Sequence, residues 1–354
     1  MAKRKEYRNY QDQTNIRDTL KLREIMTTLP RFCREFFLGI KDTTSTRTRL
    51  AYAYDLRVFF DFLHETNPIC KKKEITDYDI DVLEMIKPID ILEYLDYLTF
   101  YIKDGEEYTN DETGKQRKFS ALKSMYNFFC RMEIIEKNPA ALVQLPKVHK
   151  KEIIRLDIDE VARLLDNVET GEKLTKKQLE YHKKTKERDL AIMTLLLGTG
   201  IRVSECVGID IDDVDFNNCG ILIKRKGGYE QIVYFGDEVK DALCKYIDIR
   251  KSTIASPGHE QALFLSLQNR RISVRSVEKL VKKYAMTVTR LKRITPHKLR
   301  STYGTNLYNE TGDIYLVADV LGHKDVNTTK KHYAAQDQNR LRMAANTVKL
   351  REIK

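Results

Sequence analysis

The segment ITPHKLRSTYGTNLY, residues 294–308, holds a histidine and an arginine three positions apart, at His297 and Arg300. Residues three apart lie on one face of a helix, so the two side chains can act on the same bound group. An arginine beside a histidine suits a phosphate, which the arginine would grip while the histidine moves a proton. On its own, the pair fits two ordinary surface side chains better, so other segments must decide.

Three further segments carry side chains suited to the same chemistry. TGIRVSE offers Arg202 and Glu205 just after a helix break, and KRKGGYE puts Lys226 at the tip of a hairpin. LGHKDVNTTKKHY offers His323 and, ten residues later, Tyr333. Two arginines from distant segments can clamp a phosphate from two sides, because guanidinium groups are planar, permanently charged and bidentate. A tyrosine can then attack the phosphorus if a base takes its proton and a cationic pocket eases its ionisation.

Several of these residues have rivals. Tyr333 is one of 19 tyrosines in the chain. Three others lie near it in the sequence: Tyr303, Tyr308 and Tyr315. Lys226 competes with Arg225 and with Lys224, which strand alternation puts on the same face, but only Lys226 abuts the Gly-Gly turn. Glu205 fits a supporting role, orienting Arg202, better than a role in the chemistry.

The order and spacing of these residues resemble the catalytic signature of the tyrosine recombinases, the phage-integrase and Xer-like enzymes. That signature is an arginine, a lysine, a His-x-x-Arg motif, a histidine or tryptophan, and a tyrosine. The matching positions are Arg202, Lys226, His297, Arg300, His323 and Tyr333. The resemblance covers the chain from about residue 40 to its end and is densest in the second half. Ser301, where many relatives have histidine, and Ala334, where Xer enzymes often have Thr-His, leave the subfamily open.

The resemblance implies a site-specific DNA recombinase that cuts and rejoins strands through a 3′-phosphotyrosine on Tyr333. His297 would act as general base, Lys226 as general acid on the departing 5′ oxygen, and His323 would hydrogen-bond a non-bridging oxygen. The phosphotyrosine keeps the energy of the phosphodiester, so no ATP, metal or other cofactor is expected. The sequence contains neither a GxxxxGK[ST] phosphate loop nor a carboxylate cluster with metal-ligand spacing.

Other functions compete with this interpretation. The recombinase could be a Xer-like enzyme acting at a chromosomal site or the integrase of a phage or conjugative transposon. A type IB topoisomerase uses similar chemistry to relax supercoils, although the LGH segment and the tail after Tyr333 argue against it. A non-enzymatic DNA-binding protein with a decayed site is disfavoured by six intact positions.

The charge distribution indicates a nucleic-acid partner. The net charge is +11, and residues 251–300 carry 12 basic and 2 acidic side chains, whereas residues 51–100 carry 5 and 11. A positive patch beside a candidate phosphate site favours an anionic polymer, here double-stranded DNA with paired half-sites. The predicted DNA-binding residues are Arg270, Arg271, Arg275, Lys282, Lys283, Arg290, Lys292 and Arg293.

Composition narrows the cellular context. No apolar run approaches the roughly 20 residues that span a bilayer, and the basic N-terminus lacks the apolar stretch of a secretory signal. The six cysteines are scattered without a CxxC pair, which predicts reduced thiols and neither a zinc site nor a disulfide framework. These features predict a cytoplasmic protein with no membrane partner.

The first half of the chain must present this site to DNA, and it reads as a helical bundle. In four segments the apolar residues are spaced three or four positions apart, which is typical of an amphipathic helix. These segments are residues 29–40, 45–65, 88–103 and 117–135. Ser45 or Thr46 could cap the second of them, and one more helix is possible near residues 15–27. The polar stretch at 104–115 reads as a loop.

The second half of the chain is predicted to be mixed. Helices are expected at 156–168 and 188–198, with a turn at Thr199-Gly200 and a short helix after it. Residues 220–235 read as a β-hairpin around Gly227-Gly228, and the chain is helical again after Ser273. The fold class is therefore mainly α with a small antiparallel β-sheet: an N-terminal helical core-binding bundle, of the SAM-like kind in this family, and a C-terminal mixed α/β catalytic domain, together forming a clamp around DNA.

The expected domains follow from these elements. They are an N-terminal extension (1–28), a core-DNA-binding domain (29–145), a linker (146–157), a catalytic domain (158–336) and a tail helix (337–354). The tail has an apolar stripe, and such a short stripe usually packs on its own domain. In the resembled family the tail docks on a neighbouring protomer, so self-assembly into a tetramer on two DNA sites is expected.

Overall fold

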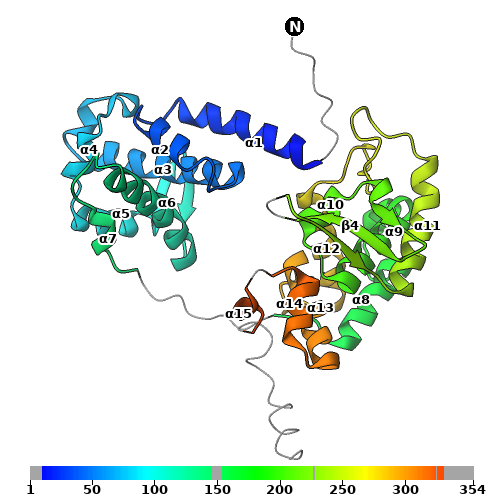
Figure 1. Cartoon of the computed structure of the whole chain (residues 1–354). Helices are drawn as coiled ribbons and strands as arrows, with labels where there is room; N and C mark the ends of the chain where they lie inside the picture. Colours follow the sequence, from blue (N-terminus) through cyan, green and yellow to red (C-terminus); the bar gives the residue numbers. More distant parts are fainter. Residues whose placement is uncertain (1–9, 146–153, 226–227, 324, 331–354) are drawn as a thin grey trace, which may run out of the picture. The chain divides into compact units, whose positions relative to one another are not determined.

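The computed structural model divides into two compact units, residues 1–150 and residues 151–354 (Figure 1). It describes residues 10–145, 154–225, 228–323 and 325–330. Helices dominate both units, and each unit has one small antiparallel sheet among its described residues. The predicted fold class, mainly α with a little antiparallel β, is confirmed.

The first unit is built from helices around one core. They are α1 (Tyr10–Met26), α2 (Cys33–Gly39), α3 (Thr46–Thr66), α4 (Asp81–Met85), α5 (Pro88–Tyr97), α6 (Glu112–Arg131) and α7 (Pro139–Leu142), with 3₁₀ turns at Cys70–Lys72 and Ile75–Asp77. Ser45 caps α3 as predicted, because its hydroxyl accepts a hydrogen bond from the Thr48 backbone N–H at 3.2 Å. The additional helix expected near residues 15–27 is α1.

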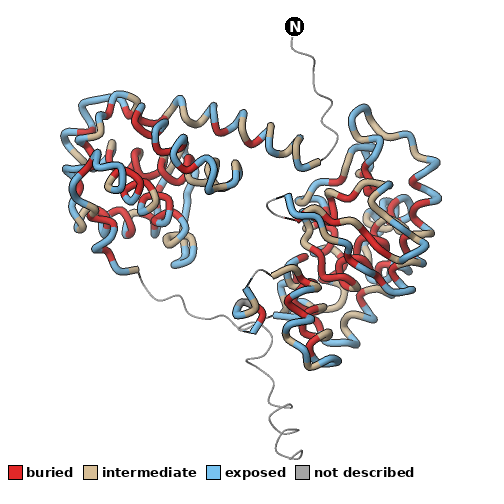
Figure 2. The backbone as a smooth tube through the Cα atoms, in the orientation of Figure 1, coloured by how far each residue is buried: buried red, intermediate tan, exposed pale blue. Residues whose placement is uncertain are grey.

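Aromatic side chains fill the core of the first unit. Phe60, on α3, is fully buried and lies edge-on to Phe32 and Tyr78, with ring centroids 6.0 and 6.3 Å apart. Figure 2 shows buried residues gathered in the interior of this unit, and α3 and α6 contribute many of them. The helical periodicity seen in the sequence is the pattern of residues that face this core.

The prediction of one helix across residues 88–103 is wrong. Helix α5 ends at Tyr97, and the chain then forms a hairpin of β1 (Phe100–Lys103) and β2 (Glu106–Thr109). Asp104 and Gly105 form its tip, with φ of 52° and 77°. Asp-Gly with two left-handed residues is a preferred two-residue hairpin turn, so local turn chemistry overrides the helical spacing. The predicted loop at 104–115 is thereby replaced by β2 and the start of α6.

The second unit contains the predicted mixed structure. Its helices are α8 (Ile158–Thr170), α9 (Lys176–Thr199), α10 (Val203–Gly208), α11 (Asp237–Ser252), α12 (Val274–Val288), α13 (Pro296–Thr311), α14 (Ile314–Leu321) and α15 (Val326–Thr329), with a 3₁₀ turn at Ile211–Asp213. Its sheet has the order β3-β4-β5, from β3 (Val214–Asp215), β4 (Gly220–Lys224) and β5 (Glu230–Tyr234). The predicted hairpin is β4–β5, in which Lys224 pairs with Glu230.

Helix α9 is the central helix of the second unit. It packs against α8, α11 and α13, and every residue from Leu190 to Leu197 is buried. Asp189, at the start of that run, accepts hydrogen bonds from the Tyr284 hydroxyl at 3.0 Å and from Lys283 at 3.2 Å. A buried carboxylate is tolerated only with such partners, so this network fixes α12 against α9.

The six cysteines are free thiols in the structure. Three are buried, among them Cys206, whose pKa is raised by burial to about 12. Within the described ranges, no helix is long and apolar enough to cross a membrane.

Candidate active site

Arg300 joins three segments of the second unit. It lies on α13 with only 3% of its surface exposed. Its Nη1 donates to the Gly200 carbonyl at 2.7 Å, and its Nη2 donates to the Leu321 carbonyl. These carbonyls end α9 and α14, where helices leave acceptors without intrahelical partners and favour cations. Arg300 therefore holds the turn before Arg202 and the turn before His323 against α13.

The turn that leads to Arg202 approaches α13 and α14 closely. Gly200 ends α9 in the left-handed conformation, with φ of +63°. A Cβ at this position would lie 2.5 Å from the Tyr303 ring and 2.8 Å from the Leu321 side chain. Only glycine satisfies both the backbone angle and this approach. The predicted break at Thr199-Gly200 is thus confirmed.

Arg202 and Glu205 form an ion pair at the start of α10. Glu205 Oε2 accepts from the Arg202 backbone N–H at 2.8 Å, and Oε1 accepts from its Nη1 at 2.9 Å. The Arg202 side chain is 39% exposed, whereas that of Glu205 is 4% exposed. The carboxylate thus orients an arginine that reaches the surface; the supporting role of Glu205 in catalysis stays a prediction.

A second arginine, Arg225, contacts the same carboxylate from the end of β4. Its Nη1 lies 3.7 Å from Glu205 Oε1, and the whole residue is 7% exposed. Burial lowers the pKa of Arg225, and the Glu205 carboxylate raises it. The sequence pattern indicated Arg225 only as an alternative to Lys226 for the catalytic position. Strand alternation could have found it, because Arg225 continues the buried face of Ile221 and Ile223.

His323 is fixed directly after α14. Its backbone N–H donates to the Ala318 carbonyl at 2.9 Å, and Gly322 turns the chain with φ of +63°. The Nδ1 atom of His323 lies 2.7 Å from the Thr329 hydroxyl, which is fully buried. A hydrogen bond at one ring nitrogen fixes the orientation of the other. Thr329 therefore orients His323, a role not predicted from the sequence.

His297 occupies the first turn of α13, as the opening motif predicts. Pro296 begins the helix, His297 is exposed, and Arg300 follows three residues later on the buried side. Proline suits a first helical position because its missing N–H has no partner there in any helix. The histidine thus lies at the surface beside the segment that Arg300 fixes.

Two predicted site residues, Lys226 and Tyr333, lie outside the described residues. Two of the three rival tyrosines are disfavoured by their surroundings. Tyr308 is 8% exposed in a small apolar cluster, and Tyr303 packs against the same cluster. Burial raises the pKa of Tyr303, which makes its phenolate costly to form. Tyr315 is 67% exposed.

Three of the predicted DNA-binding residues are engaged within the protein. Arg271 pairs with Asp210 and donates to the Ile209 carbonyl at 2.9 Å, with 9% of its side chain exposed. Lys283 binds Asp189, and the Lys292 ammonium lies 2.9 Å from Asp157 and 2.5 Å from Glu160. Such contacts hold loops and helix ends together, so they do not favour these three side chains as DNA ligands.

The other five predicted DNA-binding residues are exposed. They are Arg270, Arg275, Lys282, Arg290 and Arg293. Arg275, 78% exposed, is 3.4 Å from Glu278 in a surface ion pair of the kind that exchanges readily with solvent. This exposed set remains available at the surface of the second unit.

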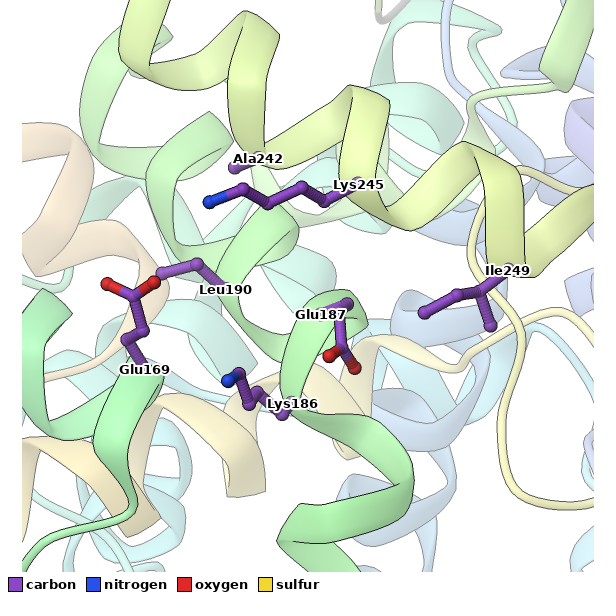
Figure 3. Close-up of a pocket in the computed structure, with 7 residues that line it drawn as sticks. All are labelled: Glu169, Lys186, Glu187, Leu190, Ala242, Lys245 and Ile249. Carbon is purple, nitrogen blue, oxygen red and sulfur yellow. The ribbon is translucent and has the colours of Figure 1, made fainter.

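No group of three or more His, Cys, Asp or Glu side chains within the described ranges is placed to hold a metal ion. A pocket of about 370 Å³ lies elsewhere in the second unit, among α8, α9 and α11 (Figure 3). Its lining is Glu169, Lys186, Glu187, Leu190, Ala242, Lys245 and Ile249. None of the predicted site residues lines it, so the chemistry is not concentrated there.

A family model described as "Phage integrase family" matches residues 155–340, more than half of the chain. The chain belongs to the phage integrase family. It is 33% identical over 324 residues to "Tyrosine recombinase XerC" of Caldanaerobacter subterraneus subsp. tengcongensis, with 88% of this chain and 85% of that protein covered. The resemblance to Xer-like tyrosine recombinases inferred from the motifs is confirmed.

Other relatives agree across most of their length. A "Tyrosine recombinase XerD" of Staphylococcus epidermidis is 30% identical, with 83% of this chain and 90% of that protein covered. "Tyrosine recombinase XerS" of Streptococcus agalactiae is also 30% identical, with 87% and 93% covered. Both are named as tyrosine recombinases.

Solved structures share the fold at low sequence identity. The XerH recombinase bound to palindromic difH substrate matches with a TM-score of 0.64 and 20% identity, over 86% of this chain and 80% of that one. The Tn1549 transposon integrase in complex with transposon right end DNA also gives a TM-score of 0.64, with 21% identity over 89% and 98% of the chains. These matches support the two-domain recombinase fold.

Proposed function

We propose that this chain is a site-specific DNA recombinase that cleaves and rejoins strands through a 3′-phosphotyrosine on Tyr333. The observation that carries the proposal is the junction made by Arg300. Its two carbonyl bonds hold the segments that bear Arg202 and His323 against the helix that bears His297. Four of the six signature residues thus lie on segments that meet at one point.

In the proposed reaction the Tyr333 oxygen forms a bond to phosphorus while the bond to the 5′ oxygen breaks. The phenol proton passes to His297, and the departing 5′ oxygen takes a proton from Lys226. Arg202 and Arg300 neutralise the non-bridging oxygens, where charge accumulates in the transition state. Rejoining is the reverse attack by a 5′ hydroxyl, so the bond energy is conserved and neither ATP nor a metal is required.

The two arginines would act differently within that clamp. Arg300 is buried and held from behind by helix-end carbonyls, so its position is set before DNA arrives. Arg202 is partly exposed and tied to Glu205, which would let it meet the phosphate while keeping its ion pair. His323, oriented through Thr329, would donate to a non-bridging oxygen.

Double-stranded DNA with paired half-sites is the proposed substrate. Its phosphates would meet the exposed cations Arg270, Arg275, Lys282, Arg290 and Arg293. The XerH and Tn1549 integrase structures named above contain their own DNA substrates, which supports duplex DNA as the partner. The curated relatives described above are Xer enzymes, which favours a Xer-like role over that of a mobile-element integrase.

We assign residues 29–145 as a core-DNA-binding domain, 158–336 as the catalytic domain and 146–157 as the linker. Residues 1–28 would be an extension of the first. The tail at 337–354 lies outside the described residues, and we propose that it docks on a neighbouring protomer in a tetramer assembled on two sites. The protein would work in the cytoplasm.

The proposal is tested with a nicked duplex that traps the covalent intermediate. Its sequence would come from selecting bound duplexes out of a randomised pool. The wild-type protein should form an adduct that survives denaturing gels and excess EDTA. Tyr333→Phe should bind the duplex equally well and form no adduct, because only the hydroxyl is lost. An adduct formed by Tyr333→Phe, or a cleavage step restored only by Mg²⁺, would refute the proposed chemistry.

A further inference from the structure

Arg225 is buried at the point where the β4–β5 hairpin leaves the sheet. β4 ends at Lys224, and the Arg225 backbone N–H still donates to the Tyr229 carbonyl at 2.7 Å. The side chain continues the interior face of the strand and is 6% exposed. A guanidinium at an apolar strand face is costly unless its donors are satisfied, so its contacts show what holds it there.

Those contacts lie at the end of α14. Arg225 Nη1 donates to the Leu321 carbonyl at 2.8 Å, and Nη2 donates to the Val320 carbonyl at 3.1 Å. Leu321 O also accepts from Arg300, so the two arginines share one acceptor. The guanidinium also packs directly against Gly322. A Cβ at position 322 would lie 2.4 Å from the Arg225 guanidinium carbon, so only glycine leaves room for it.

The third contact is the Glu205 carboxylate, 3.7 Å from Arg225 Nη1. Glu205 also holds Arg202, so one carboxylate balances a partly exposed and a buried arginine. The Nε atom of Arg225 is buried and has no hydrogen-bond partner among the described residues. The described part of the hairpin makes one other hydrogen bond to α14, from Gln231 Nε2 to the Asp319 carbonyl at 3.3 Å, and this bond is exposed. Among the described residues, Arg225 thus makes the buried hydrogen bonds that join the hairpin to α14.

We propose that Arg225 is a positioning residue for Lys226. It fixes the end of β4, which leads into Lys226, against the end of α14, which precedes His323, and against Glu205, which binds Arg202. This inference rests on the proposed function. Lys226 is the next residue in the sequence, so a displacement of Arg225, which is held by three contacts, passes to Lys226 through a single peptide bond. A general acid gains its effect only when its proton is within hydrogen-bond reach of the leaving oxygen. Arg225 would supply that placement without touching DNA itself.

The test compares two leaving groups under single-turnover conditions. One nicked duplex has the natural 5′ oxygen, and the other has sulfur at that bridging position. A thiol has a pKa of about 8.5, so it departs without a proton, whereas the alkoxide needs one. Arg225→Met keeps a long side chain but removes every donor. We expect its cleavage of the oxygen substrate to fall by up to about 100-fold, the effect of a misplacement of roughly 1 Å. Cleavage of the sulfur substrate should fall far less.

Arg250→Met is the matched control. Arg250 is 4% exposed and donates to the Ala262 and Glu260 carbonyls at 2.8 and 2.6 Å, away from the segments that bear the site. Its loss costs similar buried bonds, so any effect should be equal for both substrates. An equal fall on both substrates with Arg225→Met would show a merely structural role and overturn the proposal.

Two further variants keep the proposal separate from the proposed function. Lys226→Ala should be nearly inactive on oxygen and restored on sulfur; if sulfur does not restore it, the assignment of the acid is wrong. The test of Arg225 stays independent of that result. If Arg225→Met slows cleavage of the oxygen substrate much more than cleavage of the sulfur substrate, Arg225 positions the group that protonates the leaving atom, whichever residue that group belongs to. Arg225→Lys serves if Arg225→Met fails to fold. It should show the same selectivity, because one ammonium cannot bond two carbonyls and a carboxylate in fork geometry.

Discussion

The two units of this recombinase bury different kinds of side chain. In the first unit, contacts between Phe and Tyr rings extend from Phe32 to Tyr108. In the described part of the second unit, ring contacts are limited to His182–Tyr284 and Tyr246–Phe264. The second unit instead has arginines that donate to backbone carbonyls: Arg225, Arg250 and Arg300, which are buried, and Arg271, which is half-buried.

The difference teaches how each unit is suited to its task. Apolar packing has no fixed direction and tolerates changes of shape that conserve volume. A guanidinium bound to carbonyls fixes two backbone segments at defined distances and angles. A site for phosphoryl transfer needs that second kind of precision, because its catalysis depends mainly on positioning and charge. The first unit needs only a stable platform.

The largest effect should follow from Arg300→Lys. Lysine keeps the charge but cannot bond the Gly200 and Leu321 carbonyls and a phosphate in the same planar arrangement. We expect the rate of adduct formation to fall by about 10²–10³, the usual cost of losing one transition-state donor. Arg250→Lys, in a buried arginine outside the site, should leave the rate of the folded protein unchanged. Equal rates of adduct formation for Arg300→Lys and wild type would contradict the claim that buried arginines position the site in the second unit.

The next effect is on stability and concerns the first unit. Phe60→Ala removes a fully buried ring. It should lower the free energy of unfolding of that unit by about 3–5 kcal/mol, measured by urea denaturation. At saturating DNA the cleavage rate of the folded protein should stay near wild type. A reduced rate without reduced stability would mean that the aromatic core also positions the site.

A smaller effect, on the salt dependence of DNA binding, should distinguish exposed lysines from lysines in ion pairs. Lys282→Ala should flatten the slope of log binding constant against log salt by about 0.9, as for one lost phosphate contact. Lys292→Ala should leave that slope unchanged, because its ammonium is engaged by Asp157 and Glu160. Flattening by Lys292→Ala but not Lys282→Ala would reverse our assignment of the DNA surface.

The same lysine predicts a weak pH effect. A hydrogen bond from Lys292 holds the pKa of Asp157 below its ordinary value. Its contribution to stability is therefore present above the unfolded pKa of about 3.9 and lost as pH falls through the folded value. Thermal melts of wild type and Lys292→Ala should differ slightly at neutral pH and converge in acid. A difference that grows in acid would contradict this.

The sequence predicted the parts of the molecule in which one local rule decides the structure. Ser45 capping α3, the break at Gly200 and the β4–β5 hairpin each follow from residue types that few other conformations accept. The hairpin at Asp104-Gly105 was not predicted, because the helical spacing of apolar residues continues as far as residue 103, directly before the turn dipeptide. Both signals were in the sequence, and the turn prevailed.

The candidate site was predictable in its residue types but not in its connections. Arg202, His297, Arg300 and His323 were named from motif order, which reflects the needs of the chemistry. That Arg300 binds the ends of α9 and α14 could not be foreseen, since its partners are backbone carbonyls with no signal in residue type. The same holds for Arg271 and Lys283, which a charge count cannot tell from surface cations.

The central claim is that Tyr333 carries the DNA strand in the covalent intermediate. The direct measurement is to digest the trapped adduct with trypsin and nuclease and to locate the nucleotide by mass spectrometry. Cleavage after Lys331 and Arg340 releases residues 332–340, whose only tyrosine is Tyr333. Our account predicts the nucleotide phosphate on that peptide. A nucleotide on a peptide bearing Tyr303, Tyr308 or Tyr315, or on a residue other than tyrosine, would contradict it.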